Sequence, residues 1–386
     1  MTEEKKNGLG IVETRYADLF EDGLVLDSGV RLGKVRVAYE TYGALNADKS
    51  NVVVVCHALS GGAHAAGWHE GDRKPGWWDC MIGPDKSFDT NEYFIVSSSV
   101  LGGCYGTTGP WSTNPETGQP YGMHFPVVTV HDMVTVQAAL LDYLGIEKIL
   151  TVAGGSMGGM LALQWAVSYP ERVASTVAIA TTHQHSPQQI AFNEIARQSI
   201  MADPAWHKGD YYDKEEGPSV GLAIARMIGH VTYLSETGMQ RKFGRRLRDR
   251  ERYGYDFSLD FEVESYLRYQ GHSFVDRFDA NSLLYLTKAL DYFELAEGFD
   301  SLTESFRRAK GLFLLIAFSS DWLYPPYQLK DVAKAIRRSG GDATYYEISS
   351  DYGHDAFLLD YAKQEPLVRS FLKRAEQTQA GSSKIL

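Results

Sequence analysis

The chain contains few cysteines. Cys56, Cys80 and Cys104 are the only three among 386 residues, and no two of them form a C-x-x-C pair. A disulfide framework or a thiolate metal site would need cysteines in closely spaced sets, so neither is indicated. His183 and His185 in THQHS are not followed by further ligands at the spacing of zinc sites. We therefore expect no metal centre and a reducing, cytoplasmic location.

Long apolar segments are also missing. The first ten residues, MTEEKKNGLG, lack the apolar core of a signal peptide. The run GLFLLIAF at residues 311–318 is far shorter than the roughly 20 apolar residues that cross a bilayer. We expect no association with membranes.

An excess of positive charge is absent as well. The formal net charge is -11, whereas a general nucleic-acid binder needs a dominant cationic surface. The exception is RKFGRRLRDRER at residues 241–252. This run is typical of a solvated helical face, and the alternative is a contact for a phosphorylated cofactor.

One short motif points to chemistry. Gly154, Ser156 and Gly158 fit G-x-S-x-G, the turn that exposes a nucleophilic serine between a strand and a helix. The preceding residues 149–153 are typical of a buried strand. Apolar residues then recur at helical spacing until Pro170. The context therefore favours a nucleophile over an idle serine in a glycine-rich turn.

A serine nucleophile needs a base, and the base needs an acid that orients it. In this kind of fold the chain order is serine, acid, histidine. Asp321 directly follows the strand-like run 311–318, and His354 is the histidine that follows the last strand-like run. We predict a triad of Ser156, Asp321 and His354. Backbone N–H groups of Met157 and Leu59 are the predicted oxyanion donors.

The order of the predicted elements indicates the architecture. Residues 187–295 are helix-like and rich in aromatic side chains, without a comparable strand run. We predict an α/β-hydrolase fold, with a mostly parallel sheet flanked by helices, whose core comprises residues 1–184 and 296–386. Residues 185–295 form the predicted helical lid. The strand-like runs lie at residues 35–43, 51–59, 93–100, 149–154, 173–181, 311–318 and 343–348.

A second glycine-rich stretch, LGGCYGTTGP at residues 101–110, does not match G-x-G-x-x-G, and no helix start follows it. Dinucleotide chemistry is disfavoured, and we interpret this stretch as a loop in the wall of the site.

Arg226 narrows the reaction class. It lies in the apolar helical stretch GLAIARMIGHVTYLSE, and its helical neighbours three and four residues away include no acid. A guanidinium in such a place needs an anion, which is either another segment of the chain or a ligand carboxylate. Asp355, next to His354, could complement it by holding an ammonium group.

Seven stretches together resemble one family over nearly the whole chain: CHALSG, GSMGGMLALQWA, ARMIGHVTYLSE, FEVESYLRYQG, RFDANS, SSDWLYPP and SDYGHDAFLL. They closely resemble the α/β-hydrolase-type homoserine O-acetyltransferases of methionine biosynthesis. The resemblance implies transfer of an acetyl group from acetyl-CoA to L-homoserine without a further cofactor, and a homodimer. It also implies that Ser156, Asp321 and His354 are catalytic, while Arg226 and Asp355 bind the acceptor.

The sequence leaves alternatives open. A serine hydrolase, in which water replaces homoserine, shares the triad, and L-serine would suit the same grip on a zwitterion. A non-catalytic binding module is disfavoured because all three triad residue types are present. The donor could also be succinyl-CoA, but succinyl-using relatives often place an arginine two residues after the triad aspartate. That position is Leu323 here, so we predict an acetyl donor.

Overall fold

The computed structural model describes residues 8–382 and is built around one eight-stranded sheet. Its strands follow the order β1, β4, β8, β5, β9, β10, β11, β12. Strands β5, β8, β9, β10, β11 and β12 run parallel, whereas β1 and β4 pair antiparallel at one edge. Their bounds are Arg15–Leu19 (β1), Val35–Tyr42 (β4), Val52–Cys56 (β5), Phe94–Ser98 (β8), Thr151–Gly155 (β9), Ser175–Ile179 (β10), Leu312–Phe318 (β11) and Asp342–Ile348 (β12). The predicted mostly parallel sheet is therefore present, with a strand that overlaps each predicted run.

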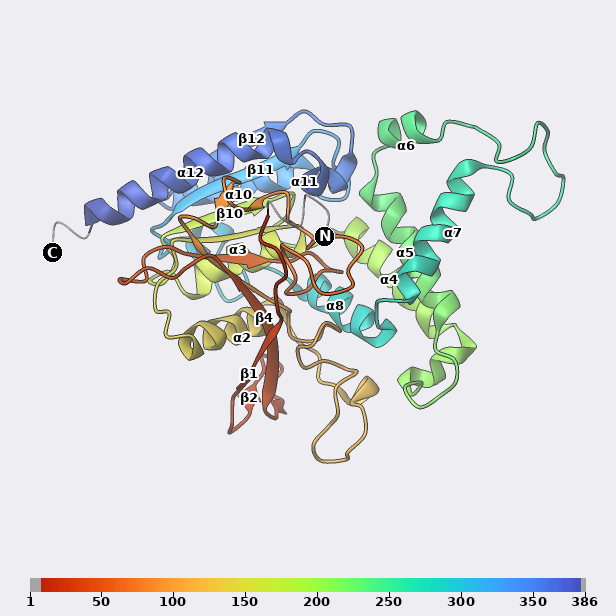
Figure 1. Ribbon diagram of the computed structural model, residues 1–386, viewed down its shortest axis with the longest axis horizontal. Helices are drawn as coiled ribbons and strands as arrows, with labels where there is room; N and C mark the ends of the chain where they lie inside the picture. Colours follow the sequence, from red (N-terminus) through yellow and green to blue (C-terminus); the bar gives the residue numbers. More distant parts are fainter. Residues whose placement is uncertain (1–7, 383–386) are drawn as a thin grey trace.

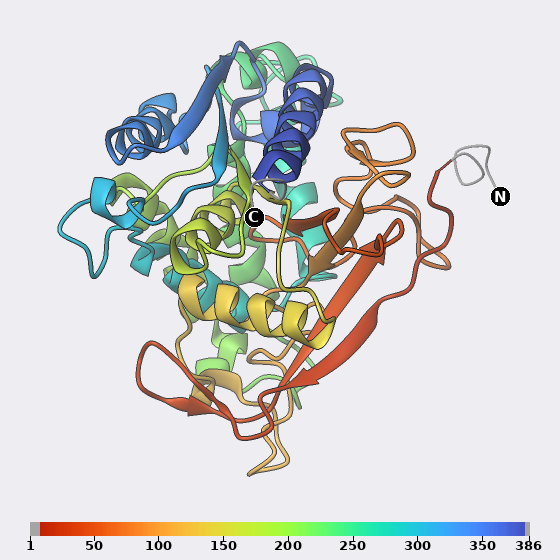
Figure 2. The same cartoon turned by 90° about the vertical axis from the view of Figure 1, so that its left-hand side faces the viewer.

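Apolar side chains cover both faces of this sheet. Every residue of β5 (VVVVC) and β11 (LFLLIAF) is buried, as expected for central strands packed on both sides. One apolar cluster joins the sheet to α2 (Val130–Tyr143), α3 (Met157–Ser168) and α10 (Pro326–Arg338). A second cluster joins it to α11 (Ala356–Leu359) and α12 (Tyr361–Ser382). In Figures 1 and 2, α2 and α12 accordingly lie on opposite sides of the sheet.

Two short strand pairs lie outside the main sheet. They are β2 (Leu24–Val25) with β3 (Arg31–Leu32), and β6 (Ile82–Gly83) with β7 (Phe88–Asp89). Two 3-10 turns, η1 (Gly122–His124) and η3 (Gly353–Asp355), lie in loops that follow sheet strands.

The connection between β10 and β11 is long and helical. It contains α4 (Pro187–Met201), η2 (Pro204–Gly209), α5 (Ser219–Tyr233), α6 (Glu236–Lys242), α7 (Glu262–Val275), α8 (Ala280–Tyr292) and α9 (Leu302–Ser305). Helices α4 to α7 stand to one side of the sheet (Figure 1). Helix α8 contributes Leu283, Leu284 and Leu286 to the apolar cluster of α2 and α3, and α4, α5 and α7 also contribute residues to it.

Small residues let α5 approach its neighbours closely. A Cβ atom on Gly221 would lie 2.4 Å from the Ser199 carbonyl oxygen on α4. A Cβ atom on Gly271 of α7 would lie 2.9 Å from the carbonyl oxygen of Ala223 on α5. The three helices therefore pack as one unit, which fixes the place of Arg226 on α5.

The basic run at residues 241–252 is not helical beyond Lys242, so the expectation of a helical face is wrong there. Gly244 has a left-handed φ of +55°, which ends the helical path. Several arginines are then paired locally: Arg246 with Glu262 at 2.8 Å and Arg250 with Asp260 at 2.7 Å. Local acids thus neutralise much of this run.

No helix within the described part of the chain is long and apolar enough to cross a membrane.

Candidate active site

Ser156 lies in a strained turn between β9 and α3. Its backbone has φ 59° and ψ -126°, an unusual conformation for a residue with a side chain. A Cβ atom on Gly158 would lie 2.0 Å from the Cys56 carbonyl oxygen, and one on Gly154 would lie 2.3 Å from the carbonyl oxygen of Gly158. Both flanking glycines are therefore required by space, as the G-x-S-x-G motif predicts.

Three strand ends bring Ser156, Asp321 and His354 together. Asp321 follows β11, and His354 lies in η3 after β12. His354 Nε2 is 2.9 Å from Ser156 Oγ, and His354 Nδ1 is 2.8 Å from Asp321 Oδ2. Because the carboxylate only accepts, Nδ1 carries the proton and Nε2 faces the serine as the basic nitrogen. The geometry is that of an activated nucleophile, its base and an orienting acid.

Tyr324 supports this arrangement, and sequence reasoning missed it. Its backbone N–H donates to Asp321 Oδ1 at 2.8 Å, and its ring centroid lies 5.0 Å from that of His354. The hydroxyl of Tyr324 contacts His185 Nε2 at 2.9 Å. The pKa of His185 is lowered by burial, although the nearby Asp291 opposes the shift. Only the position of Tyr324, three residues after Asp321, could have indicated its role.

One cavity brings several of the predicted residues together. Ser156, Leu59, Arg226 and Leu323 all line it, and much of the remaining wall is apolar. Leu59 follows β5, whereas Met157 is fully buried at the start of α3. Within residues 8–382, neither the Leu59 nor the Met157 backbone N–H donates to another part of the chain. Both donors are thus available to a bound group. Further residues of the wall are Ser60, Phe192, Thr232, Tyr233, Phe274, Leu283 and Tyr324.

Arg226 forms no ion pair with a carboxylate in the described part of the chain. Its Nη1 lies 3.5 Å from Ser60 Oγ, and its guanidinium lies 4.6 Å from the Phe274 ring centroid and 5.4 Å from that of Tyr233. Rings of this kind attract a cation but do not neutralise its charge. A guanidinium that lines the same cavity as Ser156 is therefore ready for an anionic group.

Asp355 lies next to His354 in η3, but it is not among the residues that line the cavity. Burial raises the pKa of its carboxyl group, while the charges of His354 and Arg226 oppose that shift. The structure therefore places Asp355 within electrostatic reach of Arg226 and outside the cavity wall.

Arg277 is a second cation that sequence reasoning did not single out. Its Nη1 donates to the Tyr105 hydroxyl at 3.0 Å and to the Ser60 carbonyl at 3.4 Å. Its guanidinium also lies 4.9 Å from the Phe274 ring centroid. With Arg226 and Lys242, Arg277 adds to burial in lowering the pKa of His230 to about 3. Three cations therefore act on His230 at this side of the site.

Comparisons with known proteins agree with this geometry. The family model described as alpha/beta hydrolase fold matches residues 51–361. Homoserine O-acetyltransferases of Methanohalobium evestigatum and Methanosalsum zhilinae are each 58% identical over 368 residues. The matches cover 95% of this chain and 75% and 74% of those relatives.

The chain belongs to the homoserine O-acetyltransferase family.

Solved structures agree with the family fold. The homoserine O-acetyltransferase of Bacillus anthracis is 33% identical with a TM-score of 0.88, covering 94% of this chain and 98% of that one. Esterase E22 is also 33% identical, with a TM-score of 0.86 and coverage of 94% and 100%. The predicted α/β-hydrolase fold and family resemblance are confirmed. The same fold thus occurs in proteins named as transferases and as esterases, so the acceptor must be argued from the site.

Proposed function

We propose that this member of the homoserine O-acetyltransferase family transfers an acetyl group from acetyl-CoA to the side-chain hydroxyl of L-homoserine. The observation that carries the proposal is the guanidinium of Arg226, which lines the cavity of Ser156 and has no carboxylate partner among residues 8–382. A hydrolase acting on neutral esters has no need for a free cation at this place. The identity of 58% to relatives named homoserine O-acetyltransferase supports the same acceptor.

The first half-reaction acylates the enzyme. His354 Nε2 takes the proton of Ser156 as Oγ attacks the thioester carbonyl, and the new oxyanion accepts hydrogen bonds from the backbone N–H groups of Leu59 and Met157. Asp321 stabilises the imidazolium that forms. The carbon–sulfur bond then breaks, His354 returns the proton to sulfur, and CoA leaves.

The second half-reaction uses the amino-acid acceptor. Arg226 binds the carboxylate of homoserine, which directs the hydroxyl toward the acyl carbon. Asp355 lies outside the cavity wall, and its role in this proposal is to attract the ammonium group electrostatically. His354 takes the hydroxyl proton during the attack. The bond from Ser156 Oγ to the acyl carbon breaks, and His354 returns the proton to the serine. O-acetyl-L-homoserine is the product, and no cofactor beyond the co-substrate acetyl-CoA takes part.

The donor we propose is acetyl-CoA. Leu323 stands where succinyl-using relatives often have an arginine, and it contributes an apolar side chain to the cavity wall. A desolvated succinyl carboxylate beside Leu323 would gain no cation from that residue, and Arg226, which also lines the cavity, is the proposed partner of the acceptor carboxylate. Arg277 lies against Ser60 and Phe274 and is not part of that wall.

We further propose that residues 185–295 act as a lid, that the enzyme is a homodimer, and that it works in cytoplasmic methionine biosynthesis. The proposed lid rests on the place of Arg226 in this segment. The homodimer and the cytoplasmic role in methionine biosynthesis rest on the membership of the family.

The test is a product assay with acetyl-CoA and a panel of acceptors. Thiol release should be fast with L-homoserine, slower with L-serine and minimal with water alone. Release that is independent of any amino acid would favour a hydrolase instead. Equal rates with L-serine and L-homoserine would show that the acceptor assignment is too narrow.

A further inference from the structure

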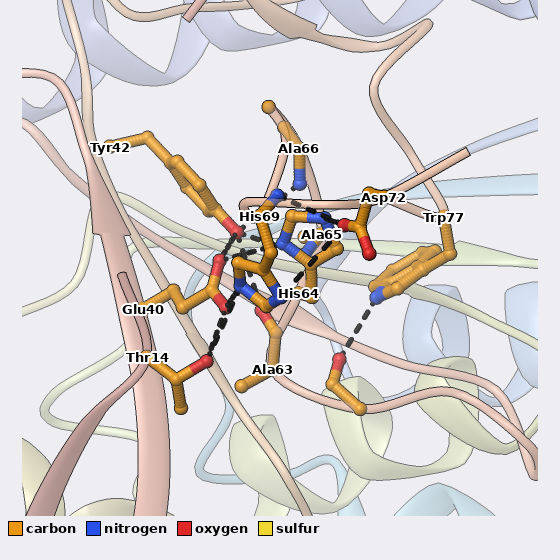
Figure 3. Close-up of polar contacts among 12 residues, drawn as sticks. Thr14, Glu40, Tyr42, Ala63, His64, Ala65, Ala66, His69, Asp72 and Trp77 are labelled. Carbon is orange, nitrogen blue, oxygen red and sulfur yellow. Dashed lines mark hydrogen bonds and ion pairs between the residues drawn. The ribbon is translucent and has the colours of Figure 1, made fainter. Parts of the chain in front are cut away.

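Two histidines and two carboxylates form a cluster away from the catalytic cavity. Glu40 lies on β4, while His64, His69 and Asp72 lie in the connection from β5 to β6 (Figure 3). Glu40, His64 and His69 each offer one atom within 4.8 Å of the others, and Asp72 lies on the other side of the two rings. The imidazole rings of His64 and His69 stack, with centroids 3.8 Å apart and planes inclined by 30°. The ring pair has Glu40 oxygens on one side and Asp72 Oδ2 on the other.

Glu40 is buried, with 1% of its side chain exposed, and it accepts from four groups. Oε1 accepts from Thr14 Oγ1 at 2.8 Å and contacts His69 Nε2 at 2.8 Å. Oε2 accepts from the Tyr42 hydroxyl at 2.7 Å and contacts His64 Nδ1 at 3.1 Å. A carboxylate only accepts, so the facing nitrogens of both histidines carry protons.

The protons fixed by Glu40 leave the opposite nitrogens, His64 Nε2 and His69 Nδ1, with lone pairs in the neutral rings. These nitrogens lie 3.5 and 3.9 Å from Asp72 Oδ2. Both distances exceed those of normal N–H···O hydrogen bonds, and buried His64 Nε2 has no hydrogen-bond partner in the described chain. A nitrogen lone pair and a carboxylate oxygen that face each other repel each other unless a cation lies between them.

The separations of the two nitrogens from Asp72 Oδ2, 3.5 and 3.9 Å, suit a shared metal ion better than protons. Two ligands on one tetrahedral zinc ion, with bonds of about 2.1 Å, lie about 3.4 Å apart. Two imidazoles with a carboxylate are a donor set that zinc accepts, with water in the fourth position. Glu40 then has the place of the outer-shell carboxylate that orients metal-bound histidines.

We propose that His64 Nε2, His69 Nδ1 and Asp72 Oδ2 bind a zinc ion, with Glu40 as the orienting carboxylate. His69 and Asp72 are about one-third exposed, at 34% and 35%, so an ion has a route from solvent. The stacked rings must open so that both nitrogens point to one ion. Glu40 holds His64 Nδ1 and His69 Nε2 in place. The two rings can therefore move apart only at their other edges, which face Asp72.

The site has a consequence for the stability of the chain. The connection that carries the three ligands also carries Leu59 and Ser60, which line the catalytic cavity. An ion held there ties this connection to β4 through Glu40. Metal binding should therefore raise the thermal stability of the chain without taking part in the reaction.

The experiment uses the full chain, stripped with a chelator and titrated calorimetrically with zinc chloride. We expect one ion per chain, a higher melting temperature on binding, and visible d–d absorption of a four-coordinate ion when cobalt(II) replaces zinc. Asp72→Asn should weaken zinc binding by at least about tenfold. Asparagine keeps an oxygen to accept the His69 backbone N–H, which donates to Asp72 at 2.9 Å.

The matched control is Asp27→Asn, because Asp27, His131 and Asp132 form another group that could hold an ion. That variant should bind zinc as tightly as the unmodified chain. His64→Gln is the second test variant and should also lose binding. The proposal is overturned if the stripped chain binds no zinc, if Asp72→Asn and His64→Gln bind it unchanged, or if only Asp27→Asn loses it. None of these results bears on acetyl transfer.

Discussion

At the scale of single residues, Arg226 is the side chain whose surroundings call most clearly for a ligand. Its guanidinium lies against Phe274 and Tyr233 and has no carboxylate partner in the described chain. Such a group is costly to leave without an anion, and the proposed acceptor carries one. The free cation therefore connects the cavity to the acceptor.

Arg226→Ala should raise the activation free energy of transfer to homoserine by about 2–4 kcal/mol. This is the cost of removing one partner of a buried charge pair. Acylation of Ser156 should survive, because that step does not involve the acceptor carboxylate. Single-turnover kinetics of each half-reaction measure the two effects separately. Arg226→Lys is the control and should retain part of the transfer rate. Equal damage to both half-reactions would mean that Arg226 is structural.

The carboxylate of Asp355 should lower the stability of the folded chain at neutral pH while supporting the binding of the acceptor. Burial raises the pKa of its carboxyl group, so the folded chain binds that proton more tightly than the unfolded chain. The resulting stability is present at low pH and is lost as the pH rises from the ordinary value of about 3.9 through the raised value. Asp355→Asn should remove this pH dependence and melt at a higher temperature at neutral pH.

The same variant should use homoserine poorly, because a neutral amide replaces the proposed partner of the ammonium group. Melting curves across the pH range and the KM for homoserine test both effects. An unchanged KM would remove Asp355 from the acceptor site.

Leu323 is the residue that we expect to govern the donor. Leu323→Arg should shift the preference from acetyl-CoA toward succinyl-CoA, because it adds a cation to an apolar part of the cavity. The ratio of kcat/KM for the two thioesters is the measurement. A higher efficiency of the unmodified enzyme with succinyl-CoA would contradict the proposed donor.

At the scale of elements, the turn from β9 to α3 is held by close backbone contacts. Gly158→Ala would place a Cβ atom 2.0 Å from the Cys56 carbonyl oxygen, at the end of a central strand that cannot easily move. We expect a loss of about 1–3 kcal/mol in the free energy of unfolding. Gly33→Ala is the control, since nothing lies within 4 Å of the place that its Cβ atom would take, and it should be nearly neutral. Chemical denaturation of both variants compares them.

Elements with strong local patterns are predictable from the sequence. The strands around 51–59 and 311–318 are continuous apolar runs, and their burial on both faces leaves few alternatives. The structure of the basic run at residues 241–252 is not predictable in this way. Its charge composition reveals neither the turn at Gly244 nor the pairing of its arginines with Asp260 and Glu262. The conformation of such a segment depends on contacts with residues far away in the sequence, and a local sequence pattern does not reveal those contacts.

At the scale of the whole molecule, the fold gathers residues that are far apart in the sequence. The triad of Ser156, Asp321 and His354 could be predicted because each residue follows a strand. The carboxyl ends of parallel strands lie at the same edge of the sheet, so residues that follow them come close together. Arg277 and the cluster of Glu40 with His64 and His69 could not be proposed in this way. Their arrangement depends on how loops and helices return to the sheet, and no periodic pattern encodes that path.

The central claim is that Ser156 carries the acetyl group between donor and acceptor. Intact-protein mass spectrometry of the enzyme mixed with acetyl-CoA alone should show one acetyl adduct that maps to Ser156 and is absent from Ser156→Ala. Addition of L-homoserine should discharge the adduct and yield O-acetyl-L-homoserine. If no adduct forms while the complete mixture still makes product through a ternary complex, the acyl-serine account is wrong.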